Sequence, residues 1–529
     1  MAIEDIIWAK NRHMFGGIAP SNMRQFSANV DASDKTKVRI TAQAPLKTTV
    51  DGQTVCTIAG VVIRKKADEY PINEFDGSPV TDEYDNSVFT GTSRFTVTDT
   101  IKENQSMYYA AFPFSKQGVY NRSSKNRAVV KPESHPSVAT YIFGYDLNTA
   151  NSDPDTRVTY PDDVDNYNWA PVTLNNLGSD WGSIQPGKKF MPQPCMLKYD
   201  CTVDYFLNPD NYTLKLDGSS SDIANALYEG NAMMQWPKIY TKRWEEDGVY
   251  HFRCSDVKVD KDYECWCNYD ANNNEIDYFY TAIYRSVSDS ARHKSVSGKE
   301  ATTGDSFEKA RTMSKANGNG WDVEVISDHL LIQDLLVMMG KSTDTQTVFG
   351  MGGFTKDNLK TNGSTNAKGL FYGDTDGSSM IKVFGMEDYW GVLGRRMLGL
   401  MYKNKTLYVK VTAGTKDGST IADYSYDENA LTSFAEKQTN PSDSEYITKM
   451  TTYPWGRLPS AFSGGSASTY ECDHYYSPND ATAAYVFSFG QRASSSQYYA
   501  GAFQYTFQYL YDSYSSKICS RLSCKPTKS

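Results

Sequence analysis

Aromatic and other residues alternate with a period of two near the end of the chain, between 503 and 511. A strict period of two is typical of a β-strand whose two faces meet different environments. The pattern therefore predicts a strand over 502–511 with its aromatic side chains on one face. That face either packs into a core, as in an ordinary amphipathic strand, or belongs to a binding surface. The alternating aromatic positions are Phe503, Tyr505, Phe507, Tyr509 and Tyr511.

Between 36 and 131 the chain reads as short strands separated by polar turns such as Asp51-Gly52-Gln53. Strand-like runs occupy 38–45, 56–66, 94–100 and 106–115. The number of strands, and the late strand Met107–Phe114 in particular, resemble a fibronectin type III-like sandwich of the immunoglobulin-like type. A Pro- and Ser-containing segment over 131–140 follows and predicts a linker.

Two segments predict helices. The first, 306–317, is polar and ends before Gly318. The second, 328–339, is apolar on nearly every side, which predicts a buried helix with a Ser327-Asp328 cap and Gly340 at its end. From Gly350 onward the pattern is one of short strands and long loops.

Composition changes this picture little. The 529 residues include 38 Tyr and 37 Gly, with 39% hydrophobic and 22% charged residues. Many Tyr, Thr, Ser, Asn, Asp and Gly residues with few helical patterns predict a mainly β fold with some α structure, in two to four domains. Trp390 and Trp455 are expected in the core, and Gly385 and Gly391 are expected to bracket a buried turn and strand.

Charge and cysteine content narrow the choice of partner and compartment. The formal net charge of −9, with no basic patch, argues against nucleic acid as a partner. No window is long and apolar enough for membrane insertion, and the first residues do not form a secretory signal. An odd number of widely spaced cysteines predicts buried thiols in a protein made in a reducing cytoplasm. They are Cys56, Cys195, Cys201, Cys254, Cys265, Cys267, Cys472, Cys519 and Cys524.

The candidate metal ligands do not converge in the sequence. Residues 250–257 and 262–269 read as two strands of a hairpin, which places Cys254 and His251 on opposite faces, so buried thiols are expected there rather than a zinc site. The stretch 270–275 begins like a calcium loop but lacks its glycine and its last glutamate, and it predicts a hairpin turn. Asp374–Gly377 is likewise a turn signal. No metal or other cofactor is predicted, and calcium at another loop stays open.

Catalytic chemistry has no clear signature either. The 63 acidic residues do not single out a pair suited to glycoside hydrolysis, and no nucleophile elbow is present. Cys519 and Cys524 lie five residues apart on what reads as the last strand, so their side chains are expected to face opposite sides. We therefore expect no catalytic residues and no enzymatic activity.

Seven segments between 141 and 526 follow one another in a characteristic order: 145–147, 153–158, 190–192, 195–197, 231–240, 382–391 and 521–526. In this order they resemble receptor-binding (tail-fibre) proteins of tailed phages and prophages of gut bacteria. A Gly-Met-Glu-Asp-Tyr-Trp-Gly segment followed by a terminal Arg-Leu-Ser-Cys strand looks like the C-type lectin-like fold, which formylglycine-generating enzymes and retroelement variable proteins share. Diversification by a retroelement stays open, because 485–516 is rich in Tyr and Ser but lacks Asn.

The resemblance implies a virion protein of the phage tail that mediates attachment to the bacterial host surface, is made in the host cytoplasm and forms a homotrimer. Its partners would be a bacterial surface receptor, either glycan or protein, and other virion tail proteins. The alternatives are a structural baseplate or capsid-decoration protein and a polysaccharide-degrading tail spike. The expected parts are a virion-docking segment over 1–32, a fibronectin type III-like sandwich over 33–132, a connector over 133–190 and a lectin-like receptor-binding head over 191–529.

The predicted receptor-binding residues lie on and beside the 502–511 strand. Tyr supplies rigid amphipathic contact area and Ser supplies adaptable hydrogen bonds, as in other recognition surfaces. Part of the aromatic face is needed for the core, so the flanking residues are the better candidates and Tyr505 and Tyr509 the less secure ones. The predicted set is Gln497, Tyr498, Tyr499, Tyr505, Tyr509, Asp512, Ser513 and Tyr514.

Overall fold

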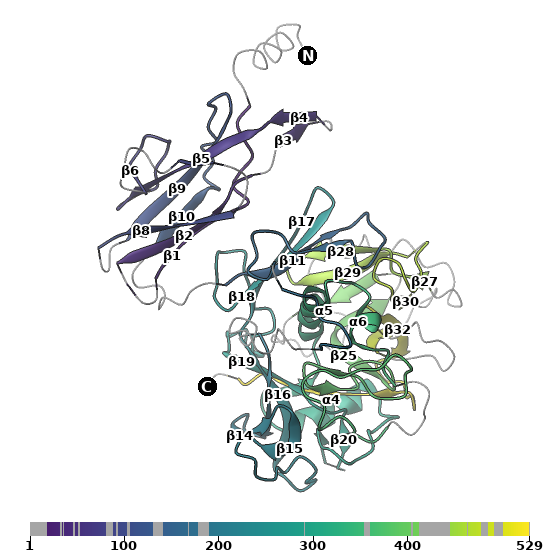
Figure 1. Cartoon of the computed structure of the whole chain (residues 1–529). Helices are drawn as coiled ribbons and strands as arrows, with labels where there is room; N and C mark the ends of the chain where they lie inside the picture. The colour runs from purple at the N-terminus through teal and green to yellow at the C-terminus, as the bar shows by residue number, and fades with distance from the viewer. Residues whose placement is uncertain are drawn as a thin grey trace. The chain divides into compact units, whose positions relative to one another are not determined.

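The structure is a computed structural model, and its chain divides into two units, 1–142 and 143–529 (Figure 1). Both are built mainly from β-strands, as the sequence predicts, and helices are few in the described part of the chain. The residues that the structure describes are 18–31, 34, 36–45, 48–50, 53–80, 88–90, 94–102, 106–130, 141–167, 169–177, 190–289, 291–353, 360–403, 406–411, 445–462, 464–477, 485–490 and 501–527.

The N-terminal unit consists of two main antiparallel sheets that share one apolar core. One sheet has the order β1-β2-β8, and the other has the order β10-β9-β5-β6 with β7 paired to β5. Apolar side chains from both sheets, such as Ile40, Ile63 and Tyr109, form the core between them. The expected late strand is present as β9. The strands are β1 (Gln25–Val30), β2 (Lys37–Gln43), β3 (Thr48–Val50), β4 (Gln53–Cys56), β5 (Ile58–Lys66), β6 (Ser78–Pro79), β7 (Val88–Thr90), β8 (Arg94–Thr100), β9 (Met107–Ser115) and β10 (Arg127–Val130).

The described residues of the C-terminal unit form three larger sheets and the two-stranded sheets β20-β21, β23-β24 and β28-β29. The orders of the larger sheets are β12-β11-β18-β17, β15-β14-β13-β16-β19-β34-β22 and β26-β25-β31-β32-β30-β27, with β33 paired to β25 in the last. The strands of its first part are β11 (Phe143–Asn148), β12 (Val158–Thr159), β13 (Gln193–Lys198), β14 (Val203–Asn208), β15 (Asn211–Lys215), β16 (Gly230–Pro237), β17 (Tyr240–Glu246), β18 (Val249–Ser255), β19 (Tyr278–Ala282), β20 (Val287–Ser288), β21 (His293–Lys294) and β22 (Trp321–Val323). Those of its second part are β23 (Lys382–Val383), β24 (Met386–Glu387), β25 (Gly394–Lys403), β26 (Thr406–Val409), β27 (Glu445–Tyr446), β28 (Lys449–Tyr453), β29 (Gly456–Ala461), β30 (His474–Tyr476), β31 (Tyr485–Phe489), β32 (Tyr505–Leu510), β33 (Ile518–Cys519) and β34 (Leu522–Cys524).

The boundary between the units corrects the expected domain division. The segment 143–148 forms β11, which pairs with β18 over its whole length and therefore belongs to the C-terminal unit. The C-terminal unit thus begins at 143, within the expected connector and well before 191. The expected linker 131–140 and the first 17 residues lie outside the described residues.

Both predicted helices are present, together with the short α6 (Thr345–Phe349). Helix α4 (Phe307–Lys315) starts at Ser306, whose hydroxyl accepts the Lys309 N–H as an N-cap. Helix α5 (Ile326–Gly340) is buried along its entire length, because its apolar side chains face every direction. It starts two residues earlier than predicted, at Ile326. The residue before it, Val325, provides no side-chain cap, so the expected Ser327-Asp328 cap is not formed.

The polar side chains of α5 are held by partners from distant parts of the sequence of the unit. Asp334 accepts hydrogen bonds from Arg243 Nε (2.7 Å), Tyr145 Oη (2.7 Å) and Tyr250 Oη (3.0 Å). Asp328 pairs with Lys525 near the end of the chain, with 2.7 Å between the Lys525 Nζ and an Asp328 oxygen. A buried polar group is costly unless it is hydrogen-bonded, so these contacts fix the helix within the unit.

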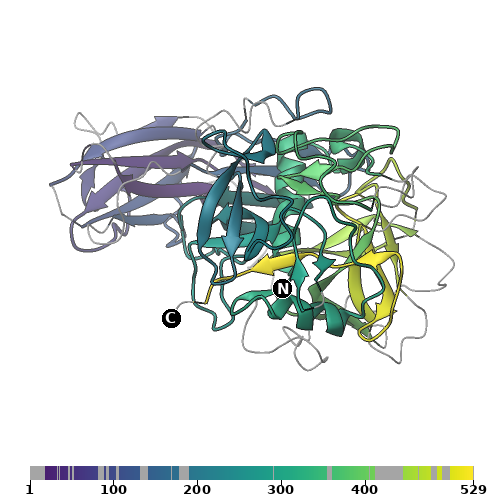
Figure 2. The ribbon, with the colours of Figure 1, turned by 90° about the horizontal axis from the view of Figure 1, so that it is seen from below.

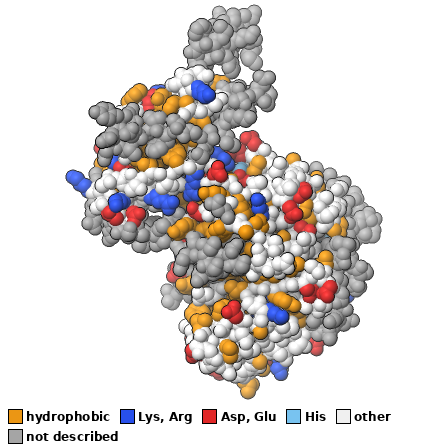
Figure 3. All heavy atoms as spheres, viewed as in Figure 1, with side chains coloured by type: hydrophobic (Ala, Val, Ile, Leu, Met, Phe, Trp, Pro, Cys, Tyr) orange, Lys and Arg blue, Asp and Glu red, His pale blue; other side chains and the backbone are white. Residues whose placement is uncertain are grey.

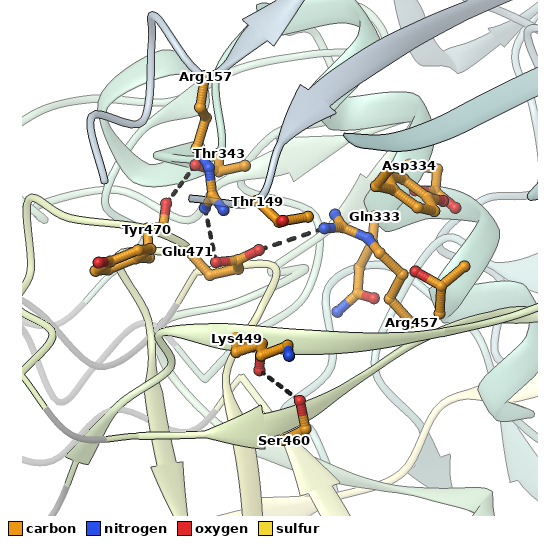
Figure 4. Close-up of polar contacts among 12 residues, drawn as sticks. Thr149, Arg157, Gln333, Asp334, Thr343, Lys449, Arg457, Ser460, Tyr470 and Glu471 are labelled. Atoms are coloured by element: carbon orange, nitrogen blue, oxygen red, sulfur yellow. Dashed lines mark hydrogen bonds and ion pairs between the residues drawn. The ribbon is translucent and has the colours of Figure 1, made fainter. Parts of the chain in front are cut away.

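A second buried ionic cluster joins the early and late parts of the unit (Figure 4). Glu471 lies between two arginines, with 2.8 Å to Arg157 Nη1 and 3.3 Å to Arg457 Nη1. All three side chains are almost completely buried. Thr343, between α5 and α6, also donates a hydrogen bond to the Tyr470 carbonyl. The cluster is therefore a structural centre with no exposed surface to offer to a ligand.

The two segments on which the lectin-like resemblance depends contact each other. Arg521 Nη2 donates to the Asp388 carbonyl at 3.2 Å, and Arg521 Nη1 donates to the Ile283 carbonyl at 2.8 Å. The expected turn and strand over 385–391 is formed around β24, and Gly385 has a φ of +80° with Met234 and Tyr212 packed where a Cβ would lie. Trp390 and Trp455 are both buried, as predicted.

The end of the chain differs from the single last strand that was expected. Cys519 lies on β33, which pairs with β25, whereas Cys524 lies on β34, between β19 and β22. In Figure 2 the yellow end of the chain lies among teal strands from the first part of the unit. Both cysteines are free thiols and they do not pair with each other, but they are separated by belonging to different sheets and not by alternation along one strand.

Candidate functional site

The predicted receptor-binding residues have different surroundings in the structure. Gln497, Tyr498 and Tyr499 lie outside the described residues. Tyr505 is completely buried, and its hydroxyl donates to Gln333 Oε1 at 3.4 Å and to the Arg457 carbonyl at 3.3 Å. Its assignment to the binding face is therefore wrong.

The reason is the position of β32 within its sheet. The strand is flanked by β31 and β30, and other parts of the unit cover both of its faces at its start. Gln504 and Thr506 are buried together with Phe503 and Phe507, so in this part of the strand the alternating pattern does not distinguish a buried face from a solvent-exposed face. Only from Gln508 onward does the strand reach the surface.

Tyr509 lies at the transition from core to surface. It is half-buried, and its ring lies beneath the Arg396 guanidinium, with 5.3 Å from the ring centroid to Cζ. Its hydroxyl accepts a hydrogen bond from Ser515 Oγ at 3.3 Å. Tyr509 thus supports the segment that follows β32 and offers only part of its ring to a partner.

Asp512, Ser513 and Tyr514 lie together in the segment 511–517, which we call the 511–517 turn. Tyr514 is 72% exposed, and Asp512 is also exposed. Ser513 is half-buried and its hydroxyl donates to the Leu510 carbonyl at 3.0 Å. This turn is where the structure brings the predicted binding residues to the surface.

The backbone of the 511–517 turn is held by groups outside it. Phe307 N–H, at the start of α4, donates to the Tyr511 carbonyl at 3.0 Å, and Gly304 N–H donates to the Ser515 carbonyl at 2.9 Å. From the core side, Arg396 Nη2 donates to the Ser513 carbonyl at 2.8 Å. None of these contacts involves the Tyr514 side chain, so the conformation of the turn does not depend on it.

Charged side chains surround the turn. Lys309 Nζ lies 2.5 Å from Asp305 Oδ1, and this hydrogen bond raises the pKa of the lysine. Lys309 also interacts electrostatically with the Tyr514 phenol and is itself more than half exposed. Asp512 adds a carboxylate. The turn therefore presents a phenol, a carboxylate and a nearby ammonium group, which are hydrogen-bonding and charged groups suited to either a glycan or a protein.

Arg396 is the buried support of this surface. It is 1% exposed, and burial lowers the pKa of its guanidinium to about 10, so it remains charged at neutral pH. Its Nε and Nη1 atoms have no hydrogen-bond partner among the described residues. Arg396 lines a small cavity of about 10 Å³, which is about the space of a single water molecule.

The same cavity is lined by a hydrogen-bonded series that sequence analysis missed. Ser520 Oγ lies 3.0 Å from His293 Nδ1, and His293 Nε2 lies 3.1 Å from Asp305 Oδ2. Burial lowers the pKa of His293. The order of groups is that of a nucleophile, a base and an acid. However, Ser520 is 3% exposed and His293 is 1% exposed, and the cavity leaves no room for a substrate. These hydrogen bonds can link the three segments that contain Ser520, His293 and Asp305. In this conformation the Ser520 hydroxyl cannot reach an external substrate.

The sequence held only part of the signal for these residues. Asp305 and Lys309 lie four residues apart at the start of a predicted helix, a spacing that brings side chains together. His293 and Ser520, by contrast, lie 227 residues apart, and no local pattern relates them.

Local geometry in the described residues shows how the segments considered as metal sites are arranged. Asp270 Oδ1 accepts the N–H groups of Asn272 and Asn274, each at 2.8 Å, which is the expected turn. Cys254 lies on β18, as predicted, but 262–269 is not the second strand of a hairpin with it; Glu264 instead forms an isolated bridge with Thr241. Cys254, Cys265 and Cys267 are buried thiols. The described part of the chain contains no group of three or more His, Cys, Asp or Glu side chains placed to hold a metal ion.

The surface and the helices add two further observations. On the face seen in Figure 3, acidic and basic side chains of the C-terminal unit are interspersed with no basic patch. Within the described ranges, no helix has the length and apolar character needed to cross a membrane.

Comparisons with known proteins found no protein family whose model matches this chain and no curated protein that is significantly similar to it.

Proposed function

We propose that this protein is a virion attachment protein of a phage and that it binds a bacterial surface molecule through the 511–517 turn of its C-terminal unit. The single observation that carries the proposal is the exposed Tyr514 on a turn whose backbone is fixed from outside. A surface that is fixed before binding loses little conformational entropy on binding, and tyrosine is among the residues enriched at binding hot spots.

In this proposal the N-terminal unit acts as a spacer with a fibronectin type III-like arrangement, and the first residues dock into the virion. The C-terminal unit acts as a lectin-like head, in line with the contact between its 382–391 and 521–526 segments. A homotrimer and the tail as location follow from the resemblance described above. The rival proposal is a purely structural virion component whose surface contacts other virion proteins only.

Binding of the labelled full-length protein to a panel of gut bacterial strains tests the proposal. Tyr514→Ala is expected to raise the half-saturating concentration at least about tenfold, because truncation of an aromatic anchor costs about 2 kcal/mol or more. The matched control is Tyr278→Ala, which removes another exposed tyrosine (47% exposed) at the start of β19. Its binding curve should coincide with that of the wild type.

Two results would contradict the proposal. If Tyr514→Ala and the wild type bind equally well, the 511–517 turn is not the receptor site. If the wild type binds no strain of the panel but assembles into virions, the structural role is the better explanation.

A further inference from the structure

Two cysteines from opposite ends of the C-terminal unit are in contact. Cys201 lies in the turn between β13 and β14 and Cys524 is the last residue of β34, 323 positions later. The distance between their Sγ atoms is 3.0 Å, and both are free thiols. The prediction of buried thiols therefore holds for Cys524, whereas Cys201 is only partly buried.

The two thiols differ in their surroundings. Cys524 is completely buried in an apolar cluster with Leu197, Trp321 and Leu522. Cys201 is only partly buried, at the edge of the same cluster, and its thiol can donate to the Asn319 carbonyl at 3.3 Å. A small reagent in solution can thus approach Cys201, whereas Cys524 is buried in contact with Cys201, with Cys195 in the same cluster.

The pKa values of the two thiols also differ, and the difference again favours reaction at Cys201. The Cys524 thiol donates a hydrogen bond to Cys201 Sγ, and this bond lowers the pKa of Cys201. Burial, by contrast, raises the pKa of Cys524 well above the usual value. Since the thiolate is the nucleophile in disulfide chemistry, Cys201 reacts first and Cys524 second.

We propose that Cys201 and Cys524 form a redox-active dithiol that is converted into a disulfide by a small-molecule disulfide such as oxidised glutathione. The Cys201 thiolate attacks one glutathione sulfur, forms a mixed disulfide and releases one glutathione thiolate. The Cys524 sulfur then attacks Cys201 Sγ and passes its proton to the departing glutathione sulfur, which leaves as the second glutathione thiol. One protein disulfide and two glutathione thiols are formed from two protein thiols and one oxidised glutathione.

The fold allows this bond at little structural cost. A disulfide has a sulfur–sulfur distance of about 2.05 Å, so the two atoms must approach by about 1 Å. Cys201 belongs to a short turn, which can make this movement without displacing β34, whose place between β19 and β22 is fixed by pairing at Tyr280 and Trp321.

The bond would crosslink β34, near the end of the chain, to the turn between β13 and β14. It closes a loop of more than 300 residues, and a disulfide restricts the unfolded chain more strongly as the loop grows. A protein made in a reducing cytoplasm would gain this crosslink on reaching an oxidising medium. The inference does not depend on the attachment role, and each can fail without the other.

The experiment uses the full-length protein, reduced and then incubated in native buffer with excess oxidised glutathione. After acid quenching and alkylation of free thiols, mass spectrometry of the tryptic digest should show the Cys201 and Cys524 peptides joined. The melting temperature should rise by about 3–6 °C relative to the reduced protein.

Two variants separate the pair from its neighbours. In Cys201→Ser the rise on oxidation should disappear; this variant leaves the buried Cys524 in place and changes only a partly exposed side chain. Cys195→Ala removes another buried thiol of the same cluster and should keep the full rise in melting temperature on oxidation. Because the oxidised and reduced forms of the same variant are compared, any loss of stability from altered packing is present in both and cancels. Any of three results would overturn the proposal. Both Cys201 and Cys524 could be found alkylated, glutathione could remain on Cys201 with Cys524 free, or the crosslink could include Cys195.

Discussion

His329 is expected to make the C-terminal unit lose stability as the pH falls below about 6.5. The side chain is 1% exposed on the buried helix α5, and its Nδ1 lies 2.8 Å from Tyr389 Oη. Its Nε2 lies 3.2 Å from the amide nitrogen of Gln333, which can only donate, so Nε2 accepts and Nδ1 carries the proton. A second proton would have to displace the Gln333 contact.

The sign and size of the effect follow from the environment of the ring. Burial, and then the nearby Arg395 cation, hold the pKa of His329 well below its usual value. In the unfolded chain the group titrates near 6.5, so below this pH the unfolded state binds a proton that the folded state does not. If His329 stays neutral in the folded state down to pH 5, acidification from pH 7.5 to pH 5 removes about 2 kcal/mol of stability.

The measurement is urea unfolding of the wild type and His329→Gln at pH 7.5 and pH 5, followed by tryptophan fluorescence. Eight of the nine tryptophans lie beyond residue 142, so the signal reports mainly on the C-terminal unit. The variant is less stable than the wild type at pH 7.5 because it loses ring packing, including the contact with Phe489. Its deficit should shrink by about 2 kcal/mol at pH 5, because it lacks the titrating group.

Groups that titrate in both proteins contribute equally to the two unfolding free energies, so their contributions cancel in the difference between wild type and variant. Leu331→Ala, on the same helix and 2% exposed, is the matched control, and its deficit should be the same at both pH values. A His329→Gln deficit that does not change with pH would refute the reasoning and would mean that His329 takes up its proton in the folded state.

Three further outcomes are expected. Phe507→Ala should destabilise the C-terminal unit by about 3–5 kcal/mol in the same unfolding assay, since the ring is completely buried among other aromatic rings; a cost under about 1 kcal/mol would contradict this. Glu471→Gln should cost about 3–5 kcal/mol, because it leaves Arg157 and Arg457 as buried charges without their carboxylate; a neutral effect would show that the cluster is not a structural centre. Limited proteolysis should cut within 131–142 and leave a resistant C-terminal fragment, whereas early cuts scattered through 200–400 would contradict the two-unit division.

Local sequence was sufficient to predict an element where the residues that determine it lie within the element or next to its ends. Helix α4 has a serine cap and a glycine after its end, and it forms close to the predicted residues. The run of apolar residues in α5 predicted a buried helix because only a protein interior can accept a helix that is apolar on every side. Helix α5 starts at Ile326, two residues earlier than predicted, and no side-chain cap fixes that end.

The candidate site shows where local pattern fails. The alternation over 503–511 correctly predicted a strand, but the burial of Tyr505 depends on β30 and β31 on its two sides and on the segments that cover both faces. The exposure of Tyr514 depends in turn on Arg396 and the start of α4, which hold the turn at the surface.

The sequence by itself therefore determined the elements: the mainly β character, the two helices, the buried tryptophans and the Tyr- and Ser-rich segment near the end. The tertiary structure alone decided the juxtapositions, such as His293 with Ser520 and Cys201 with Cys524. Periodicity and capping act between residues a few positions apart, whereas these contacts join residues 227 and 323 positions apart. Such pairs meet only when the sheets pair and pack, because no energetic preference within either segment encodes the position of the other.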